Sequence, residues 1–384
     1  MAALKEDVGR VTSSAQSSSC STKAQVNSFF KKKYFYSQLF LFLLLQLLFT
    51  LSLVSYWYLP CQPLQNSCFS EQLSPPITPM ITILLWTWPF DKKRGSIEGF
   101  HCLDSSIREL NCQITLNRSW YDRAHAVIIH HPDVSSNPFR QLPTEPRPNG
   151  QRWIWFSLES PSHLKNLHAM DGLFNLTMSY RSDSDIFTPY GWLKPREGER
   201  NNSLIRPPFP KTKLVAWVVS NWKKDSIRMK YFGKLKPYLS VDIYGKQHIP
   251  LPSKRQQIIL SKYKFYLAFE NSLHQDYITE KLWKNALKAW AIPVVYGPPR
   301  HNYERFLPSD AFIHVDDFKK PQELATYIMK LNTDEKGYLA YFQWREHLEV
   351  VIRTGWHQEF CKACRILQES PTYRTLPMLS TWFT

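Results

Sequence analysis

The 384-residue sequence has few acidic residues and no internal repeat, and both shortages narrow the possible classes of protein. Only 32 Asp and Glu residues oppose 48 Lys and Arg residues, so the formal net charge is +16. A chain this basic either binds an anionic ligand or carries a basic surface. The lack of a repeated unit argues against a solenoid or a propeller.

The N-terminal part of the chain has a first segment without apolar periodicity and a second segment without charged residues. Residues 1–33 are polar, rich in serine and without apolar periodicity, which predicts a disordered tail. Residues 34–58 contain no charged residue, and aromatic clusters flank their Leu- and Phe-rich interior. Such a segment can span a bilayer with its aromatic residues at the two interfaces. A cleaved signal peptide is the alternative, but this segment lies far from Met1 and has bulky residues where cleavage requires small ones. We therefore expect a signal anchor.

The charges before the predicted anchor give its orientation. Lys31, Lys32 and Lys33 predict a cytoplasmic N-terminus, hence a type II protein whose later residues are lumenal. Sequons agree with this location, at Asn117, Asn175 and Asn201. The length of the apolar segment suits the thinner early secretory membranes, which favours the Golgi membrane. Nucleic acid is excluded as a partner there, so an anionic sugar nucleotide, or only a basic surface, remains.

About 300 residues follow the anchor, enough for two α/β domains. Residues 59–80 are rich in Pro, Gln and Ser and predict a stem. Apolar strands are expected at 81–86, 125–131, 153–158 and 214–219, each followed by polar residues, as in a parallel sheet with its site along one edge. The polar, proline-bearing segment 201–210 predicts a linker. We expect an N-terminal domain over 81–205, a second domain over 206–355 with a helix at 338–356, and a C-terminal segment over 356–384.

The stretch 263–299 predicts a strand at 264–269, a helix at 278–290 and a strand at 292–296. Two strands joined by a helix imply a parallel pair, which binds ligands beyond its carboxyl ends. The residues at that edge are ionic or polar, namely Glu270, Asn271, Asp276, Tyr277, Glu280 and Lys281. The helix N-terminus adds N–H donors for phosphate. Lys281, Lys284 and Lys288 would share one helix face, so a solvated stripe is the alternative interpretation of Lys281.

The sequence of this stretch resembles the donor-binding motif of the α1,3-fucosyltransferases. The matching parts are FENS, then DYITEKL, NA and IPVVYGP. The resemblance extends from about residue 81 to the C-terminus. It implies the GT-B architecture, in which two Rossmann-like α/β domains face each other across a cleft, and GDP-β-L-fucose as the donor. It also implies inverting transfer of L-fucose to O3 of N-acetylglucosamine in the N-acetyllactosamine chains of glycoproteins and glycolipids. The alternatives are another acceptor, such as type 1 chains or the N-glycan core, and a non-catalytic Golgi glycan-binding protein of the same fold.

Glu159 is the candidate general base. It follows a strand of Trp and Phe residues, an environment that would raise the pKa of a carboxylate toward useful basicity. A capping or ion-paired acid is the alternative. The segment LESPSH resembles the family's segment with the general base, so we assign catalysis to Glu159.

The leaving GDP requires cations. Ser220-Asn221 with Arg228 resembles the family's SN-x6-R, whose Arg holds the diphosphate, because a guanidinium can bind two phosphate oxygens at once. Taken alone, Arg228 could be one more surface cation. The resemblance makes Lys281 the second cation, and Glu280 lies close enough for a ribose hydroxyl. It also places four further residues in the donor site, Tyr190, Tyr266, Asn271 and Tyr277, each of which could instead be a packed aromatic or a turn residue.

Asp183-Ser184-Asp185 is similar to the Asp-x-Asp signature of metal-dependent glycosyltransferases. No acidic partner cluster accompanies it, and the resembling family holds the phosphates with side-chain cations rather than a metal. Arg181 offers either Asp an ion pair. We therefore expect no metal and no cofactor apart from the donor substrate.

On the acceptor side, His131 and Pro132 fall where the family has a His followed by a variable residue that influences acceptor choice. Pro132 departs from the Trp or Arg often found there. Asp91-Lys92 likewise differs from the Gly-Gln common in close relatives. The preference between type 1 and type 2 chains therefore stays open.

All cysteines except Cys20 would lie in an oxidising compartment. Cys361-Lys-Ala-Cys364 could be a redox pair or half of a zinc site, but no second close pair completes such a site. The resemblance implies two disulfides instead, Cys102–Cys361 and Cys112–Cys364. Cys61 and Cys68 belong to the stem and would pair either with each other or between chains, which leaves a homodimer open.

Overall fold

The computed structural model describes residues 40–52, 80–89, 102–103, 109–197, 204–353, 355–370 and 372–384. The chain divides into two compact units, Met1–Pro76 and Ile77–Thr384. In the first unit, residues 40–52 form a helix that exposes its Phe and Leu side chains. None of the helices in the described ranges is both long enough and apolar enough to cross a membrane. The predicted tail, the flanks of the predicted anchor, and Cys61 and Cys68 lie outside these ranges.

The N-terminal half of the second unit is built on a parallel sheet with the strand order β4-β1-β5-β6-β7-β8. Its strands are β1 (Ile81–Leu85), β4 (Cys112–Thr115), β5 (Ala126–His130), β6 (Arg152–Ser157), β7 (Leu176–Ser179) and β8 (Ile186–Phe187). Every residue of β5 and β6 is buried, as expected for central strands covered on both faces. Short helices follow or connect them: η2 (Arg118–Arg123), α2 (His131–Val134), α3 (Pro138–Gln141), η3 (Pro161–His163) and η4 (Leu167–Met170). The strands predicted at 81–86, 125–131 and 153–158 are therefore present, each with ends shifted by about a residue.

The C-terminal half contains a second parallel sheet with the order β11-β10-β12-β13-β14. Its strands are β10 (Lys213–Val218), β11 (Asp242–Tyr244), β12 (Tyr263–Phe269), β13 (Ile292–Tyr296) and β14 (Ile313–His314). Alternate residues of each strand face opposite sides. One side packs against α4 (Ile227–Leu235) and α7 (Pro321–Thr333), and the other against η6 (Lys281–Leu287). Smaller helices complete this half: η5 (Ser253–Arg255), α5 (Gln256–Leu260), α6 (Arg300–Tyr303) and η7 (Val315–Asp317).

The predicted helix over 278–290 is shorter and wound differently, because η6 is a π-helix. Its hydrogen bonds span five residues, from Lys288 N–H to Trp283 O at 3.0 Å and from Ala291 N–H to Ala286 O at 3.0 Å. The wider turn separates residues that a 3.6-residue helix would align. The side chain of Lys281 is only 13% exposed, whereas Lys284 and Lys288 are exposed. The prediction that the three lysines share one face is therefore wrong.

The prediction of a helix over 338–356 is also wrong in its second part. Helix α8 (Glu335–Ala340) and the short η8 (Gln343–Glu346) are followed by a strand, β15 (Leu348–Ile352). Strand β15 pairs antiparallel with β9 (Gly191–Pro195), which follows the first sheet in the chain. The β-branched run at residues 350–352 favours this extended conformation.

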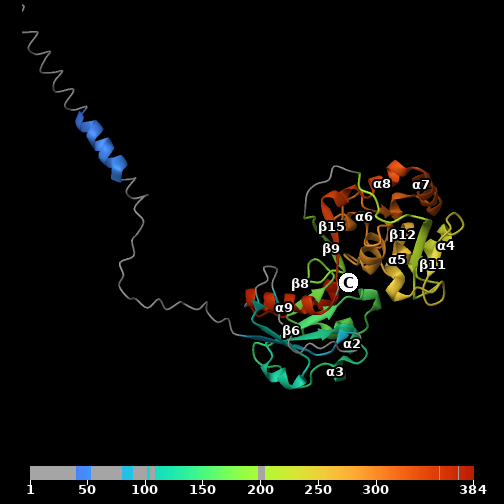
Figure 1. Cartoon of the computed structure of the whole chain (residues 1–384). Coiled ribbons are helices and arrows are strands. Elements are labelled where there is room, and N and C mark those ends of the chain that lie inside the picture. The colour runs from blue at the N-terminus through green and yellow to red at the C-terminus, as the bar shows by residue number, and fades with distance from the viewer. Residues whose placement is uncertain are drawn as a thin grey trace, which may run out of the picture. The chain divides into compact units, whose positions relative to one another are not determined.

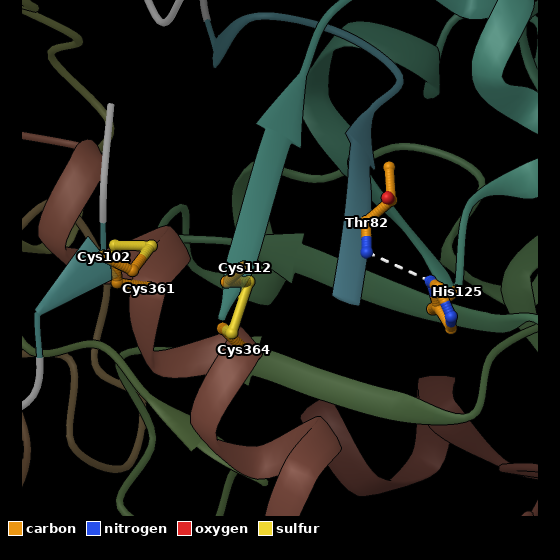
Figure 2. The surroundings of a disulfide bond; sticks show 6 residues. All are labelled: Thr82, Cys102, Cys112, His125, Cys361 and Cys364. Carbon is orange, nitrogen blue, oxygen red and sulfur yellow. Dashed lines mark hydrogen bonds between the residues drawn. A yellow bond between two sulfur atoms is a disulfide. The ribbon is translucent and has the colours of Figure 1, made fainter. Parts of the chain in front are cut away.

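The C-terminal segment returns to the first half, where α9 (His357–Glu369) lies beside the sheet that contains β6 (Figure 1). Two cysteines one helical turn apart on α9 form disulfides with β2 (Cys102–Leu103) and β4, and β2 pairs with β3 (Glu109–Leu110). These disulfides, Cys102–Cys361 and Cys112–Cys364, are the pairs that the resemblance implies (Figure 2). Beside them, Thr82 N–H donates to Nδ1 of His125 at 3.0 Å. Helix α10 (Leu379–Phe383) then packs on the same core.

Candidate active site at the carboxyl edges of the two sheets

Glu159 lies two residues beyond β6, at the carboxyl edge of the first sheet. Its backbone N–H donates to Oγ of Ser157 at 3.1 Å, which fixes the turn. Burial raises the pKa of Glu159, the positive charge of Lys281 from the other half opposes this rise, and the negative charge of Glu280 adds to it. A partly buried carboxylate with a raised pKa is a better proton acceptor than an exposed one. The environment expected for a general base is thus present.

Hydrogen bonds join the loop that carries Glu159 to the loop after β12. Oγ of Ser272 donates to Oγ of Ser160 at 2.6 Å, although the two residues belong to different halves. Oγ of Ser162 lies 2.7 Å from Nε2 of His274 in a second contact of this kind. The two sheet edges therefore meet at these loops, and the candidate base faces residues of the C-terminal half.

Lys281 is the centre of a compact ionic cluster at the start of η6. Its Nζ lies 3.0 Å from Oε2 of Glu270 and 3.3 Å from Oε1 of Glu280, and it donates to Oγ1 of Thr279 at 2.8 Å. Burial opposes the charge of Lys281, but the two carboxylates outweigh it and raise its pKa. Glu270 is 1% exposed, and burial raises its pKa against the effect of Lys281. Lys281 is therefore a half-buried cation paired with two carboxylates rather than part of a solvated stripe.

Arg228 is a buried cation of a different kind. Located on α4 and 4% exposed, it donates from Nη2 to the carbonyl of Asn221 at 2.9 Å and from Nη1 to that of Phe269 at 3.5 Å. Its Nε has no hydrogen-bond partner, and no carboxylate of the described ranges lies within ion-pair distance. Burial lowers its pKa. A desolvated guanidinium with an unused N–H donor favours binding of an anionic ligand.

The predicted donor-site tyrosines occupy different environments. The hydroxyl of Tyr190 donates to the carbonyl of Leu158 at 2.7 Å, next to the candidate base. Tyr277 contacts Tyr180 edge-on with ring centroids 5.0 Å apart, and burial together with Tyr190 and Glu270 raises its pKa. Tyr266 instead belongs to the core beneath η6, where its hydroxyl accepts from Asn285 at 3.0 Å. The structure thus favours the packed-aromatic interpretation for Tyr266.

The remaining predicted donor residues lie on loops at the same sheet edge. Ser220 and Asn221 are exposed just beyond β10, and Asn271 is half-buried beside Glu270. Glu280 is 49% exposed at its side chain and pairs with Lys281, which lowers its pKa against the effect of burial. These positions are compatible with ligand contact, and their roles remain predictions.

Asp276 is a residue of this edge to which the sequence analysis gave no role. Its Oδ2 accepts from N–H and Oγ of Ser182 in the N-terminal half, at 2.9 and 2.7 Å. Its Oδ1 accepts from Nδ2 of Asn302 at 2.6 Å and from Nη1 of Arg305 at 3.0 Å. The residue has a left-handed φ of 58°. A buried carboxylate with four donors and a strained backbone thus fastens the donor loop to the other half.

The prediction of an acceptor contact at His131 is wrong, because its side chain is 0% exposed. Nδ1 accepts from the indole of Trp155 at 3.1 Å, so Nε2 carries the hydrogen and donates to the carbonyl of Lys165 at 2.8 Å. Burial lowers the pKa of His131 to about 4. The neighbouring His130 is 1% exposed, and its Nδ1 lies 2.7 Å from Oδ2 of Asp133. Pro132 is half-buried on α2, and Lys92 lies outside the described residues.

The two aspartates of the Asp-x-Asp sequence already have protein partners. Asp183 pairs with Arg181 at 2.8 Å, as the sequence allowed. Asp185 accepts from N–H and Oγ1 of Thr177, both at 2.8 Å, and pairs with Arg374. Among the described residues, no group of three or more His, Cys, Asp or Glu could hold a metal ion. The interpretation as structural ion pairs accounts for both residues.

The predicted glycosylation sites differ in accessibility. Asn117 is exposed at the start of η2. Asn175 is 1% exposed, since its Oδ1 accepts from Trp153 N–H at 2.7 Å and its Nδ2 donates to the carbonyl of Arg374 at 2.6 Å. A glycan on Nδ2 would require the chain around Arg374 to move, so this arrangement conflicts with the prediction at Asn175. Asn201 lies outside the described residues.

Comparison with known proteins gives two family matches that together cover most of the chain. "Fucosyltransferase, N-terminal" matches residues 78–191, and "Glycosyltransferase family 10 (fucosyltransferase) C-term" matches residues 208–382. The human 4-galactosyl-N-acetylglucosaminide 3-alpha-L-fucosyltransferase FUT5 is 54% identical over 317 residues, 82% of this chain and 83% of that protein. The bovine 3-galactosyl-N-acetylglucosaminide 4-alpha-L-fucosyltransferase FUT3 is 55% identical over 303 residues, 79% of this chain and 82% of that protein.

A solved structure is also similar, that of an alpha1,3-fucosyltransferase with GDP-fucose. The TM-score is 0.51 at 18% sequence identity, and the match covers 80% of this chain and 95% of that one. At this identity the likeness shows the fold. Together with the two parallel sheets, it confirms the predicted α/β fold of the GT-B type.

Proposed function

The chain belongs to the fucosyltransferases of glycosyltransferase family 10, and we propose that it transfers L-fucose from GDP-β-L-fucose to O3 of N-acetylglucosamine in N-acetyllactosamine chains. The name of the human relative supports this acceptor, and the solved structure with GDP-fucose supports the donor. The observation that carries the proposal is geometric. The loop that holds Glu159 is joined to the loop after β12 by the hydrogen bond from Ser272 to Ser160 at 2.6 Å, and the cation Lys281 lies at the start of η6 on the same sheet edge.

In the proposed reaction, Glu159 accepts the proton of the acceptor O3–H as that oxygen attacks C1 of fucose. The bond from C1 to the β-phosphate oxygen breaks on the opposite face, its electron pair stays with GDP, and the configuration at C1 inverts through an oxocarbenium-like transition state. The raised pKa of Glu159 makes the proton transfer more favourable than it would be to an exposed carboxylate. A single base is sufficient, since GDP needs no proton from the enzyme.

Arg228 and Lys281 would stabilise the charge that builds on the diphosphate. The unpartnered Nε of Arg228 and its buried position make this guanidinium the stronger candidate for direct contact. The charge of Lys281 is already paired with that of Glu270, and this buried carboxylate fixes the position of the ammonium group. Glu280, which is more exposed, would bind a ribose hydroxyl of the donor.

We propose that the reaction needs no metal ion and no cofactor besides the donor. Asp183 and Asp185 are held by arginines, and side-chain cations are available for the phosphates. Treatment with EDTA should leave the rate of transfer unchanged. A strict requirement for an added divalent cation would contradict this part of the proposal.

An acceptor panel tests the main proposal. The purified protein is incubated with GDP-fucose and type 2 chains, type 1 chains and N-glycan cores, and the linkage of each product is determined by NMR. Formation of α1,3-fucosylated N-acetyllactosamine is expected. Transfer to the N-glycan core alone would replace this acceptor, and failure to transfer fucose to any acceptor would favour a glycan-binding role.

A second acceptor has specific support, because the bovine relative is named for 4-linked transfer and is as similar as the human one. In type 1 chains O3 of N-acetylglucosamine is occupied and O4 is free, so α1,4 transfer would use the same base on a rotated sugar. The type 1 arm of the panel measures this activity directly.

We also propose a type II anchor in the Golgi membrane. Residues 34–58 carry no charge, and the described part, the helix at 40–52, exposes a run of Phe and Leu side chains that lipid would cover. Resistance of the protein to alkaline extraction of Golgi membranes, with residues after 60 protected from added protease, is expected. Release by alkaline carbonate would contradict the anchor.

A further inference from the structure

His163 is a titratable residue near Glu159 that the proposed reaction does not use. It ends η3, the short helix that begins two residues after Glu159, and it is exposed. The loop that carries it is joined to the loop after β12 by the hydrogen bond from Ser272 to Ser160. His163 therefore belongs to the N-terminal half but lies close to where the two sheet edges meet.

A chain of hydrogen bonds holds one nitrogen of the His163 imidazole. Oγ of Ser272 donates to Oγ of Ser160 at 2.6 Å, and Oγ of Ser160 lies 3.0 Å from Nδ1 of His163. Because Ser160 accepts from Ser272, its own hydrogen is left for Nδ1, and the neutral ring carries its hydrogen on Nε2. Among the residues that the structure describes, Nε2 has no hydrogen-bond partner. A neutral His163 thus has an unused N–H donor.

The same chain can also stabilise the protonated ring. Oγ of Ser272 lies 3.2 Å from Oδ1 of Asn271, which is an acceptor at the far end of the chain. When the imidazole is protonated, Nδ1–H donates to Ser160, Ser160 donates to Ser272, and Ser272 donates to Asn271. Only the hydroxyl hydrogens rotate in this change. In both charge states Nε2 keeps its hydrogen and stays available to a ligand.

The cations that act on His163 come from three elements of the C-terminal half. Burial lowers the pKa of His163, and the positive charges of Lys223 on the loop after β10, Arg228 on α4 and Lys281 on η6 lower it further. The neutral imidazole is therefore favoured in the free protein near neutral pH. An anion bound among these cations would oppose their effect, because its negative charge favours the imidazolium form.

Two further titratable groups lie on the loops next to His163. His274, on the loop after β12, has its Nε2 2.7 Å from Oγ of Ser162, and its pKa is lowered by burial, His163 and Arg181. Glu159 lies on the same loop as His163, and burial raises its pKa. A proton taken up here is therefore assigned by replacing the two histidines separately.

We propose that His163 donates from Nε2 to a diphosphate oxygen of bound GDP-fucose, and that the ring takes up a proton when this donor binds. The inference rests on the proposed function and adds to it a donor contact from the N-terminal half. The proton comes from water and binds Nδ1, and it returns to water when GDP leaves. The diphosphate is then held from both halves, by His163 on one side and by Arg228 and Lys281 on the other. Donor binding consequently becomes stronger as the pH falls.

Calorimetry of the full-length protein measures this proton. GDP-fucose is titrated at one pH in buffers of different ionisation enthalpy, and the dependence of the observed heat on the buffer gives the number of protons taken up. GDP-fucose is the suitable probe, because each of its phosphates is substituted on two sides and lacks the ionisation of a terminal phosphate near pH 6. The titration is repeated between about pH 6 and 8, where a histidine changes its charge.

Three variants accompany the wild type. His163→Gln keeps an amide N–H for the phosphate but cannot take up a proton. His274→Gln tests the second histidine at the meeting edges. His168→Gln is the matched control, because His168 is an exposed histidine on η4 in the same half. Thermal unfolding of each preparation checks that the variant is folded.

The wild type, His168→Gln and His274→Gln should each take up as much as about one proton per GDP-fucose bound, and His163→Gln should take up none. The wild-type affinity should be roughly three- to twentyfold higher at pH 6 than at pH 8, which is the linkage expected when a bound anion favours the imidazolium. The affinity of His163→Gln should not follow the pH over this range.

Wild-type binding of GDP-fucose without proton uptake would overturn the proposal, whether or not the variants fold. The same uptake in His163→Gln as in the wild type would also overturn it, and uptake lost only in His274→Gln would assign the proton to His274 instead. Failure of the proposed function is distinguishable, since the wild type would then bind no GDP-fucose at any pH in the series.

Discussion

Replacement of Asp276 by Asn should disable the enzyme although the residue is not expected to touch either substrate. Its carboxylate accepts four hydrogen bonds. Two come from N–H and Oγ of Ser182, one from Nδ2 of Asn302 and one from Nη1 of Arg305. An amide in its place turns one oxygen into an NH₂ group that faces two of those donors. Asn tolerates the left-handed backbone at this position, so the effect should come from the lost contacts.

The magnitude follows from these contacts. Hydrogen bonds to a charged group contribute roughly 1.5–3 kcal/mol each, so the loss of two costs at least about 3 kcal/mol. If this penalty falls on the docking of the donor loop against Ser182, kcat/KM for GDP-fucose should drop roughly 150-fold. Because Tyr277 follows Asp276 on this loop and Lys281 begins the helix after it, we expect a higher KM for GDP-fucose as well as a lower kcat.

The assay compares kcat and KM for GDP-fucose with thermal unfolding of the same preparation. Asp310→Asn is the matched control, since that aspartate is exposed on the same half, and it should behave as the wild type. Arg305→Gln removes one contact to Asp276 and one to Ser182 and should have an intermediate effect. A folded Asp276→Asn enzyme with wild-type KM and kcat would refute the reasoning.

Three further outcomes are expected. Lys281→Ala should weaken GDP-fucose binding in calorimetry and cost about 3–5 kcal/mol of stability, because it leaves the buried Glu270 without its cation. Lys284→Ala, at an exposed position, should change neither quantity. Equal losses in the two variants would contradict this prediction. The pKa of His131 is about 4 in the folded protein and 6.5 in the unfolded chain, so the free energy of unfolding should fall by up to about 3 kcal/mol as the pH drops from above 6.5 to 4. Urea unfolding of His131→Gln should show a smaller loss over the same pH range. Cys364→Ser should cost less in denaturant unfolding than half of the loss on replacing both Cys361 and Cys364. The remaining bridge, Cys102–Cys361, still joins residues 259 positions apart.

The sequence predicted the longest strands of both sheets, β1, β5 and β6 in the first and β10, β12 and β13 in the second, but not the shorter β4, β7, β8, β11 and β14. The apolar runs of the longest strands are buried on both faces and end in polar residues, a pattern that depends only on local composition. The assignments at 278–290 and 338–356 were less successful. A π-helix and an α-helix share the same apolar composition, and β15 forms because β9, far away in the chain, offers it a partner. Such effects depend on tertiary contacts that a single segment does not contain.

The candidate site shows the same division. The family resemblance pointed to Glu159, Arg228 and Lys281, and the structure places Glu159 and Lys281 at two sheet edges whose loops are joined by a hydrogen bond from Ser272 to Ser160. The choice of His131 for the acceptor side was wrong, because α2 turns this residue into the core, where its Nδ1 accepts from Trp155. The sequence placed Asp276 at the ligand edge but could not predict its role, because that role depends on Ser182, 94 positions earlier in the chain.

Glu159→Gln is the most direct test of the proposed catalytic mechanism, because it keeps the shape of the side chain and removes only its ability to accept a proton. Calorimetry should show GDP-fucose binding at wild-type affinity, while transfer to N-acetyllactosamine, measured with radiolabelled donor, should fall by at least about 100-fold. Wild-type turnover by the folded Glu159→Gln enzyme would contradict the assignment of Glu159 as the general base.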